Sequence, residues 1–381
     1  MQSPPLSLYI HLPWCERKCP YCDFNSHETE NIPEQDYIRA LLADLDGDLH
    51  LAAGRTVETL FIGGGTPSLF SAEAITYLLG GIRERLDVSA DLEATMEANP
   101  GSAEARKFQG FREAGINRIS LGVQSFNNKQ LTSLGRIHSA EQAHSAITMA
   151  RAAGFENFNI DLMHGLPGQT PTDAAADLEQ ALAYDPPHLS WYQLTLEPNT
   201  VFYKRPPVLP VEDVLADIQD EGEALLAQAG MSQYEVSAYS RPGKQCRHNL
   251  NYWSFGDYLA IGAGAHGKIT EASGAITRYA KTRSPQDYLR ADPGEFTASS
   301  RQLSSGETIE EFMLFNLRLN RGFYEGEFEQ RTGLSIAVVE TRLNSLVDKK
   351  LLDRQGSHIT TTELGRRFLD SVIAEFLDER S

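Results

Sequence analysis

Three of the four cysteines in this 381-residue chain, Cys15, Cys19 and Cys22, stand close together near the N-terminus. Three thiols cannot all pair as disulfides, and the thiols of a protein in a reducing compartment stay free. The spacing therefore predicts a metal or redox site whose remaining ligand comes from elsewhere. An iron–sulfur cluster suits three thiolates on one loop. Zinc is the alternative, but zinc sites usually take paired ligands from separate segments, and Cys246 has no thiol near it.

Apolar β-type runs alternate with amphipathic helical stretches through the first two-thirds of the chain. Helices are expected over residues 34–52 and 139–154, the second with Ser139 as its N-cap. Such alternation predicts a parallel sheet whose strands are connected by helices. The strands are expected at residues 6–12, 57–65, 91–99, 116–125, 158–165 and 188–196.

Polar or glycine-rich residues follow five consecutive strands of this series. The cysteine loop follows the first strand, and the segments GGGTP, EANPGS, GVQS and DLMHGLPG follow the next four. The active site of a β/α barrel lies at the carboxyl ends of its strands. The pattern therefore favours an α/β fold with a partial (β/α) barrel, although a doubly wound open sheet has the same local periodicity.

The last part of the chain predicts a second, smaller domain. A β-type run at 233–240 precedes the segment 246–267, which is rich in aromatic residues and glycine. A Ser- and Thr-rich stretch then predicts a boundary near residue 300, with domains at 1–300 and 301–381. The second domain resembles a small winged-helix α+β module. Its 11 basic and 14 acidic side chains give a net charge of -3, so no basic surface indicates DNA binding.

The composition excludes some classes of partner. The chain has 34 basic and 52 acidic residues and a net charge of -18 at pH 7, which repels nucleic-acid phosphates and anionic lipids. Its N-terminus lacks the pattern of a secretion signal, and no apolar run is long enough to span a membrane. We therefore expect a cytoplasmic protein with no transmembrane segment and no nucleic-acid partner.

The cysteine spacing after a first strand resembles the signature of the radical S-adenosylmethionine superfamily, in which three cysteines hold a [4Fe–4S] cluster and S-adenosylmethionine chelates the fourth iron. The motifs YIHLPWC, GGGTP, EANP, GVQSF, LGRIH and NIDLMHGLPGQT resemble, in this order, those of the oxygen-independent coproporphyrinogen III oxidase group. By this resemblance Cys15, Cys19 and Cys22 hold the cluster. It further implies S-adenosylmethionine contacts at Tyr9, Tyr21, Gly64, Gly65, Thr66, Glu97, Gln124, Arg136 and Asp161.

Two features separate the chain from the true dehydrogenases of that group. Those enzymes have a further cysteine two residues past the third cluster ligand, where this chain has Phe24. The segment HNLNYW is similar to the H-N-x-x-Y-W segment of the HemW-type haem chaperones, a branch of the same group. A histidine can be an axial ligand of haem, and aromatic faces suit a porphyrin. The resemblance implies haem binding by His248, Asn249, Tyr252 and Trp253.

The resemblance implies a haem chaperone that binds a [4Fe–4S] cluster, S-adenosylmethionine and haem and delivers haem to acceptor proteins, respiratory proteins among the candidates. The alternatives are oxidative decarboxylation of coproporphyrinogen III and an iron–sulfur redox regulator. Transient membrane association and a homodimer are both compatible with this interpretation. The sequence does not rank His11, His164 and His266 as alternative haem ligands.

Overall fold

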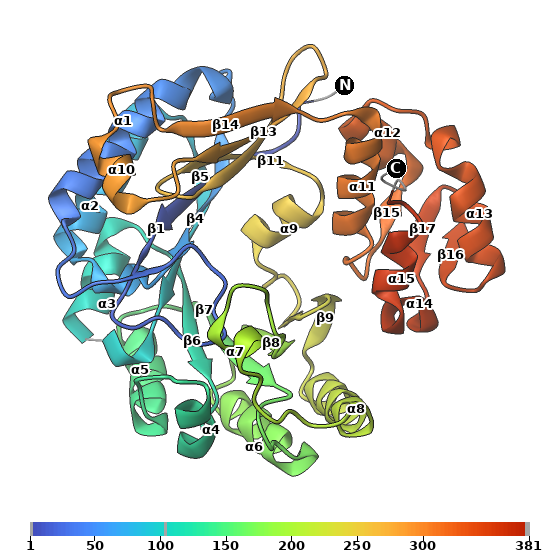
Figure 1. The fold of residues 1–381 in the computed structure, drawn as a ribbon, viewed down its shortest axis with the longest axis horizontal. Coiled ribbons are helices and arrows are strands. Elements are labelled where there is room, and N and C mark those ends of the chain that lie inside the picture. The colour runs from blue at the N-terminus through green and yellow to red at the C-terminus, as the bar shows by residue number, and fades with distance from the viewer. Residues whose placement is uncertain (1–2, 103–104, 378–381) are drawn as a thin grey trace.

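The computed structural model describes residues 3–102 and 105–377. A large α/β unit and a smaller C-terminal unit lie side by side in Figure 1. The large unit is a strongly curved sheet with most of its helices on the outer face, whereas the short helix α9 (Arg247–Trp253) lies on the inner side. This arrangement is a partial barrel, which the polar and glycine-rich residues after successive strands had favoured.

The curved sheet has twelve strands among the described residues. Those at its centre pair in parallel, and hairpins extend it at both edges. In spatial order the strands are β14 (Thr297–Gln302), β13 (Ile276–Lys281), β12 (His266–Thr270), β11 (Asp257–Ile261), β1 (Leu6–Leu12), β4 (Val57–Gly64), β5 (Val88–Ala98), β6 (Arg118–Gln124), β7 (Asn157–His164), β8 (His188–Gln193), β10 (Ala238–Ser240) and β9 (Ser232–Glu235).

All six strands expected from the sequence form within a few residues of their expected bounds. Strand β1 shows why its sequence folds this way. Leu6, Leu8 and Ile10 alternate along the strand and belong to the hydrophobic core under the outer helices. Because successive side chains point to opposite faces of a sheet, Ser7 and Tyr9 face the interior of the barrel.

One expectation about the later strands is wrong, and one strand was not expected. Residues 233–240 form not one strand but the hairpin of β9 and β10. The segment 246–267 contains helix α9 and also β11, which pairs in parallel with β1 and so adds a strand that the sequence analysis missed. The run DYLAI is short and lies between aromatic and glycine-rich residues, and its partner is distant in the chain. Local periodicity therefore gave no signal for it.

Several helices of the barrel begin at an N-cap residue whose side chain accepts a backbone hydrogen bond. Ser139 is the N-cap of α5, as expected, and its hydroxyl accepts a hydrogen bond from the Gln142 amide in a capping box. The helices of this unit are α1 (Glu34–Ala52), α2 (Ala72–Arg85), α3 (Ala105–Ala114), α4 (Asn128–Ser133), α5 (Ala140–Ala152), α6 (Pro171–Leu182), α7 (Val201–Lys204), α8 (Glu212–Gln228), α9 and α10 (Pro285–Arg290).

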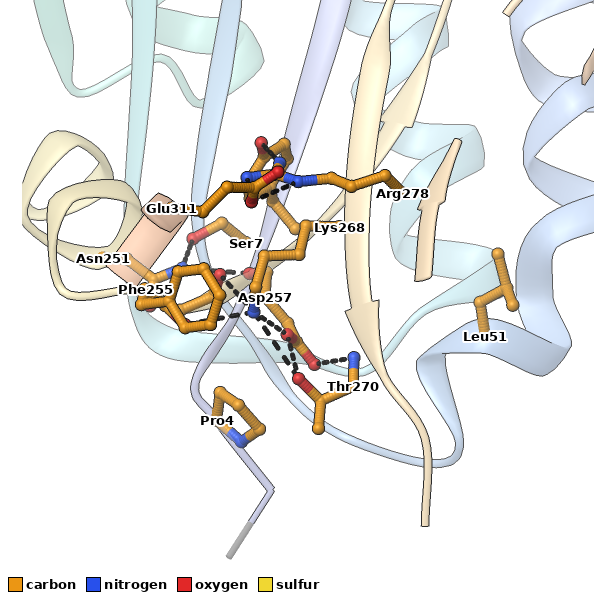
Figure 2. A network of polar contacts seen from close by, with 12 residues as sticks. Pro4, Ser7, Leu51, Asn251, Phe255, Asp257, Lys268, Thr270, Arg278 and Glu311 are labelled. Atoms are coloured by element: carbon orange, nitrogen blue, oxygen red, sulfur yellow. Dashed lines mark hydrogen bonds and ion pairs between the residues drawn. The ribbon is translucent and has the colours of Figure 1, made fainter. Parts of the chain in front are cut away.

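A buried ionic network fixes β11 against β12 beside helix α9 (Figure 2). Lys268 Nζ lies 2.9 Å from Asp257 Oδ1, and Arg55 Nη1 lies 2.7 Å from Asp257 Oδ2. Burial lowers the pKa of Lys268 to about 8, although the Asp257 carboxylate opposes this shift. The Asp257 carboxylate also accepts a hydrogen bond from the Thr270 amide at 2.8 Å. Each buried charge therefore has partners, which is the condition under which such a pair is tolerated.

The C-terminal unit has the helix–turn–helix and hairpin of a winged-helix module. It comprises α11 (Ser305–Asn316), β15 (Phe323–Tyr324), α12 (Glu325–Thr332), α13 (Glu340–Asp348), β16 (Leu352–Gln355), β17 (His358–Thr361), α14 (Glu363–Arg367) and α15 (Leu369–Ala374). Its core includes Phe312 and Phe328, and Phe255 and Ile276 of the large unit pack into the same cluster. The boundary expected near residue 300 lies within β14 and stays a prediction.

Within the described residues, none of the helices combines the length and the apolar character needed to cross a membrane.

Candidate functional site

The cysteine loop is closed at its base by two short paired strands, β2 (Trp14–Cys15) and β3 (His27–Glu28). All three thiols line one cavity of about 500 Å³, and burial raises the pKa values of Cys15 and Cys22. Each sulfur has its own polar neighbour: Thr66 Oγ1 at 3.6 Å from Cys15, Arg136 Nη1 at 3.5 Å from Cys19 and Ser26 Oγ at 3.6 Å from Cys22.

In the described part of the chain, no group of three or more His, Cys, Asp or Glu side chains is arranged as the ligands of one metal ion. A four-iron cluster does not require that arrangement, because each thiolate binds a different iron. The donor set of three free thiols on one loop therefore fits a cluster. The neighbouring Arg136 fits an anionic ligand, because its Nε is buried and has no hydrogen-bond partner.

The glycine-rich turn at the end of β4 forms a wall of the cavity beside the cysteine loop. Gly64 has φ 116°, and a Cβ there would lie 2.6 Å from the His11 ring. A Cβ on Gly65 would lie 2.4 Å from the Trp14 carbonyl oxygen. Side chains are therefore excluded at both positions, because the turn packs tightly against the end of β1 and the start of the cysteine loop. The Gly65 amide donates to the Leu12 carbonyl oxygen at 2.8 Å, and the Thr66 amide donates to the Trp14 carbonyl oxygen at 2.7 Å. Gly64, Gly65 and Thr66 all line the cavity, as the sequence analysis expected.

The structure brings the predicted polar residues at the strand ends into the same cavity. Glu97 Oε2 accepts the Gly64 amide at 3.2 Å, and Gln124 Oε1 accepts the Tyr192 hydroxyl at 2.7 Å. The residues of the predicted S-adenosylmethionine set that line the cavity are Tyr21, Gly64, Gly65, Thr66, Glu97, Gln124, Arg136 and Asp161.

Tyr9 is the exception in that set. Its side chain lines a second cavity of about 820 Å³ instead, and its hydroxyl lies 2.9 Å from His11 Nδ1. The reason is its place on β1: Tyr9 lies three residues before the strand ends, below the level of the glycine-rich turn. All four residues expected to bind haem line this second cavity, namely His248, Asn249, Tyr252 and Trp253.

His248 lies in helix α9, between the inner face of the sheet and this second cavity. Its Nδ1 is 3.0 Å from Thr59 Oγ1, and its ring centroid is 5.2 Å from that of Phe61. Burial, and secondarily the charge of Arg118, lowers the pKa of His248 to about 3. The imidazole is therefore neutral at physiological pH, which is the form that binds a metal.

The aromatic pair of the segment is held partly by the C-terminal unit. The Tyr252 ring lies 4.8 Å from that of Phe315, and the Arg318 guanidinium lies 4.4 Å from the centre of the Trp253 ring. Arg318 Nη2 also lies 3.6 Å from Glu235 Oε2. Both Trp253 and Arg318 line the cavity of the cysteines. The smaller unit thus completes a wall of the site.

The two cavities adjoin each other. Phe24, which is 60% exposed, lines both of them. The residues that line both cavities are Phe24, Gly64, Glu97, Asn249 and Trp253.

The sequence analysis missed several residues of these walls. Ser120 faces the cysteine cavity and could have been found, because it alternates with Gly122 and Gln124 along β6. Tyr192 and Arg318 also line that cavity and had no local signal. Thr59 had none either; it lines neither cavity but contacts His248 from the inner face of β4.

The alternative haem ligands have different settings. His11 and His266 line the second cavity, and His11 is held by the Asn25 carbonyl oxygen at 2.9 Å from its Nε2. His164 is buried elsewhere, with its ring 4.2 Å from that of Trp191 and its Nδ1 without a hydrogen-bond partner.

Replacing His164 with phenylalanine is expected to make stability less sensitive to acid. Burial lowers the pKa of His164 from 6.5 to about 4. The unfolded chain therefore takes up a proton near pH 6.5 that the folded chain does not, so stability falls as the pH falls from 6.5 towards 4. At about pH 5 this linkage costs about 2 kcal/mol. Urea unfolding at about pH 5 and about pH 8 should show a smaller loss of stability in the variant. An equal loss in both proteins would contradict this role.

Glu97 is expected to make binding of S-adenosylmethionine depend on pH. Burial, and then the nearby Asp161, raises the pKa of Glu97 to about 8. An ionised carboxylate accepts hydrogen bonds from ribose hydroxyls better than a protonated one. Binding near pH 6.5 must therefore release a proton, and affinity should rise roughly tenfold up to about pH 8. Equilibrium dialysis with the ligand checks this. The Glu97→Gln variant should bind with a flatter pH profile, and an unchanged slope would contradict the assignment.

Comparison with known proteins agrees with this geometry. Residues 9–181 match the Radical SAM superfamily, and residues 303–368 match the HemN C-terminal domain. The heme chaperone HemW of Haemophilus influenzae is 51% identical over 381 residues, which is 99% of each chain. The heme chaperone HemW of Escherichia coli strain K12 is 50% identical over 380 residues, which is 100% of each chain.

The solved structure of coproporphyrinogen III oxidase (HemN) from Escherichia coli, described as a radical SAM enzyme, has the same fold. It superposes with a TM-score of 0.83 at 26% identity, and the match covers 99% of this chain and 91% of that chain. Sequence identity of about half over the full length with the heme chaperones, together with this shared fold, establishes the family. The chain belongs to the heme chaperone HemW family of the radical SAM superfamily.

Proposed function

We propose that this protein is a haem carrier built on a radical S-adenosylmethionine scaffold. It binds haem in the larger cavity through His248, and it hands the haem to acceptor proteins. The observation that carries the proposal is the pair of adjoining cavities. One is lined by three free thiols, and the other is lined by a neutral, buried imidazole beside Tyr252 and Trp253.

The smaller cavity fits a cluster and S-adenosylmethionine. Cys15, Cys19 and Cys22 would hold the iron, and the glycine-rich turn would line the site of the ligand. Arg136 would bind the carboxylate of S-adenosylmethionine, and Glu97 and Asp161 would accept hydrogen bonds from its ribose hydroxyls. When bound, the cluster supplies an electron that can cleave the sulfonium of S-adenosylmethionine.

The larger cavity suits haem in size and chemistry. Its volume of about 820 Å³ lies within the range of cofactor sites. His248 Nε2 has no hydrogen-bond partner among the described residues, so it is free to bind iron. Arg283 and His266 also line the cavity, and they offer cationic or hydrogen-bonding groups to the carboxylates of haem in a chain whose net charge is -18.

The alternative, oxidative decarboxylation of coproporphyrinogen III, has less support. Phe24 stands where the dehydrogenases of the group have a further cysteine. The relatives at about half identity are named heme chaperones, whereas the structure named for the oxidase is 26% identical. We place the carrier in the cytoplasm, with respiratory haem proteins among its candidate acceptors. A homodimer and transient contact with a membrane surface are compatible with this role.

A transfer assay tests the proposal. The full chain is reconstituted anaerobically with iron and sulfide, loaded with haem and mixed with an apo-haem protein. The haem spectrum should move from the carrier to the acceptor. The same preparation, given coproporphyrinogen III, a reductant and S-adenosylmethionine, should form no protoporphyrinogen. Product formation without transfer would overturn the carrier role in favour of the decarboxylase.

A further inference from the structure

We propose that Thr59, with Ser7 behind it, is a positioning residue for the haem ligand. Its hydroxyl pairs with Nδ1 of His248 and so leaves Nε2 as the nitrogen that faces haem. This inference rests on the proposed function, because it takes His248 as the iron ligand.

A row of polar side chains on the inner face of the barrel docks helix α9. Ser7 and Thr59 are register partners on β1 and β4, and Thr59 and Glu93 are register partners on β4 and β5. All three side chains contact α9. Asn251 Nδ2 donates to Ser7 Oγ at 2.7 Å (Figure 2), Thr59 Oγ1 lies 3.0 Å from His248 Nδ1, and the His248 amide donates to Glu93 Oε1 at 3.0 Å.

The donors in this row can be counted. Asn251 Nδ2 uses its two protons on Ser7 Oγ and on the Asp257 carbonyl oxygen, which lies 3.0 Å away. Ser7 Oγ therefore accepts from Asn251. The Ser7 and Thr59 hydroxyls lie 2.7 Å apart, and either one can donate to the other. Asn251, Ser7 and Thr59 thus form a continuous chain of hydrogen bonds that ends at His248 Nδ1.

The chain accommodates either tautomer of the ring. When Nε2 carries the ring proton, Ser7 donates to Thr59 and Thr59 donates to Nδ1. When Nε2 binds iron, Nδ1 carries the proton and donates to Thr59, and one hydroxyl proton of the Ser7–Thr59 pair then has no acceptor within this row. The imidazole can therefore take the metal-binding tautomer without a buried, unpaired N–H, which is a costly group.

The ring is also held in orientation. Phe61 follows Thr59 by two residues on β4, so both side chains face the barrel interior. Its ring lies at 34° to the His248 ring. A hydrogen bond to the second nitrogen of a ligating histidine fixes its tautomer and raises its basicity. Thr59 is placed to do both.

Haem titration of the reconstituted full chain tests the role of Thr59. The Thr59→Val variant should bind haem roughly tenfold more weakly. In the ferrous haem complex its iron–histidine stretching band should move to lower frequency, because Nδ1–H has lost its acceptor. Thr59→Ser should restore both readouts. Thr95→Val is the matched control, because Thr95 is buried on the neighbouring strand β5 and its hydroxyl has no partner. That variant should bind like the original chain.

The outcomes separate this inference from the proposed function. If His248→Ala loses haem affinity but Thr59→Val binds as tightly as the original chain, or more tightly, with an unshifted band, Thr59 is not a positioning residue. If His248→Ala binds normally, the ligand assignment fails and this inference fails with it.

If Thr59→Val does not fold, nitrogen-15 histidine spectra of the unaltered chain with zinc protoporphyrin decide the question. A His248 Nδ1–H that exchanges slowly with solvent supports the proposal, and one that exchanges at the solvent-exposed rate overturns it.

Discussion

Replacing Cys19 with serine is expected to abolish the iron–sulfur cluster and to leave haem binding in place. The described cysteine loop offers three thiolates for a four-iron cluster, so losing one leaves two irons without a protein ligand, and S-adenosylmethionine can supply only one of the missing ligands. Cys19 is also the thiol that faces Arg136, at 3.5 Å. Iron and acid-labile sulfide per chain after anaerobic reconstitution measure the loss, and a haem titration measures what remains.

Cys246 supplies the matched control for this change. It is fully buried and lies 3.7 Å from Glu93 Oε1, away from the cysteine loop. Burial raises the pKa of its thiol to about 11, which is typical of an inert, protonated cysteine. The Cys246→Ser variant should keep its full iron content. Loss of iron from this variant, with normal iron in Cys19→Ser, would contradict the assignment of the cluster loop.

Replacing His248 with alanine is expected to weaken haem binding by about a hundredfold, or ~2.7 kcal/mol. The change removes the axial nitrogen, whereas Tyr252 and Trp253 still offer apolar surface to the porphyrin. Iron and sulfide content should be unchanged, because His248 does not line the cavity of the cysteines. Haem titration followed by absorbance measures the affinity.

The other imidazoles of the larger cavity provide the comparison for His248. His266→Ala and His11→Ala remove rings that line the same cavity, so they test the two alternative ligands directly. Both variants should retain most of the haem affinity. A hundredfold loss in His266→Ala together with normal binding in His248→Ala would move the ligand to β12.

The central strands could be predicted because each one is apparent from its own residues. Leu6, Leu8 and Ile10 alternate with inward-facing residues, and each of the six expected strands precedes a helix or a polar turn. Strand β11 was not predictable in this way, since its parallel pairing with Leu6–Ile10 is set by contacts across most of the chain. The boundaries of β9 and β10 depend on a tight hairpin turn, and no glycine, proline or asparagine marks it within the run 233–240.

The predicted site residues came together because the carboxyl ends of parallel strands meet at one edge of the sheet. This rule explains why Glu97, Gln124 and Asp161 share a cavity. The rule does not say how far a residue lies from the carboxyl end of its strand. It therefore could not show that Tyr9, three residues before the end of β1, lines the other cavity. It also says nothing of Arg318, which arrives from the C-terminal unit, or of Thr59, whose role depends on where helix α9 docks.

The shared wall between the two cavities has a thermodynamic consequence. A molecule bound in one cavity that moves the side chain of Glu97, Asn249 or Trp253 also changes the binding surface of the other cavity. Such an influence is reciprocal by necessity: whatever factor the sulfonium cofactor imposes on the dissociation constant of the porphyrin, the porphyrin imposes on that of the cofactor. With S-adenosylmethionine and haem in the two cavities as proposed, the affinity for haem would therefore depend on the concentration of S-adenosylmethionine.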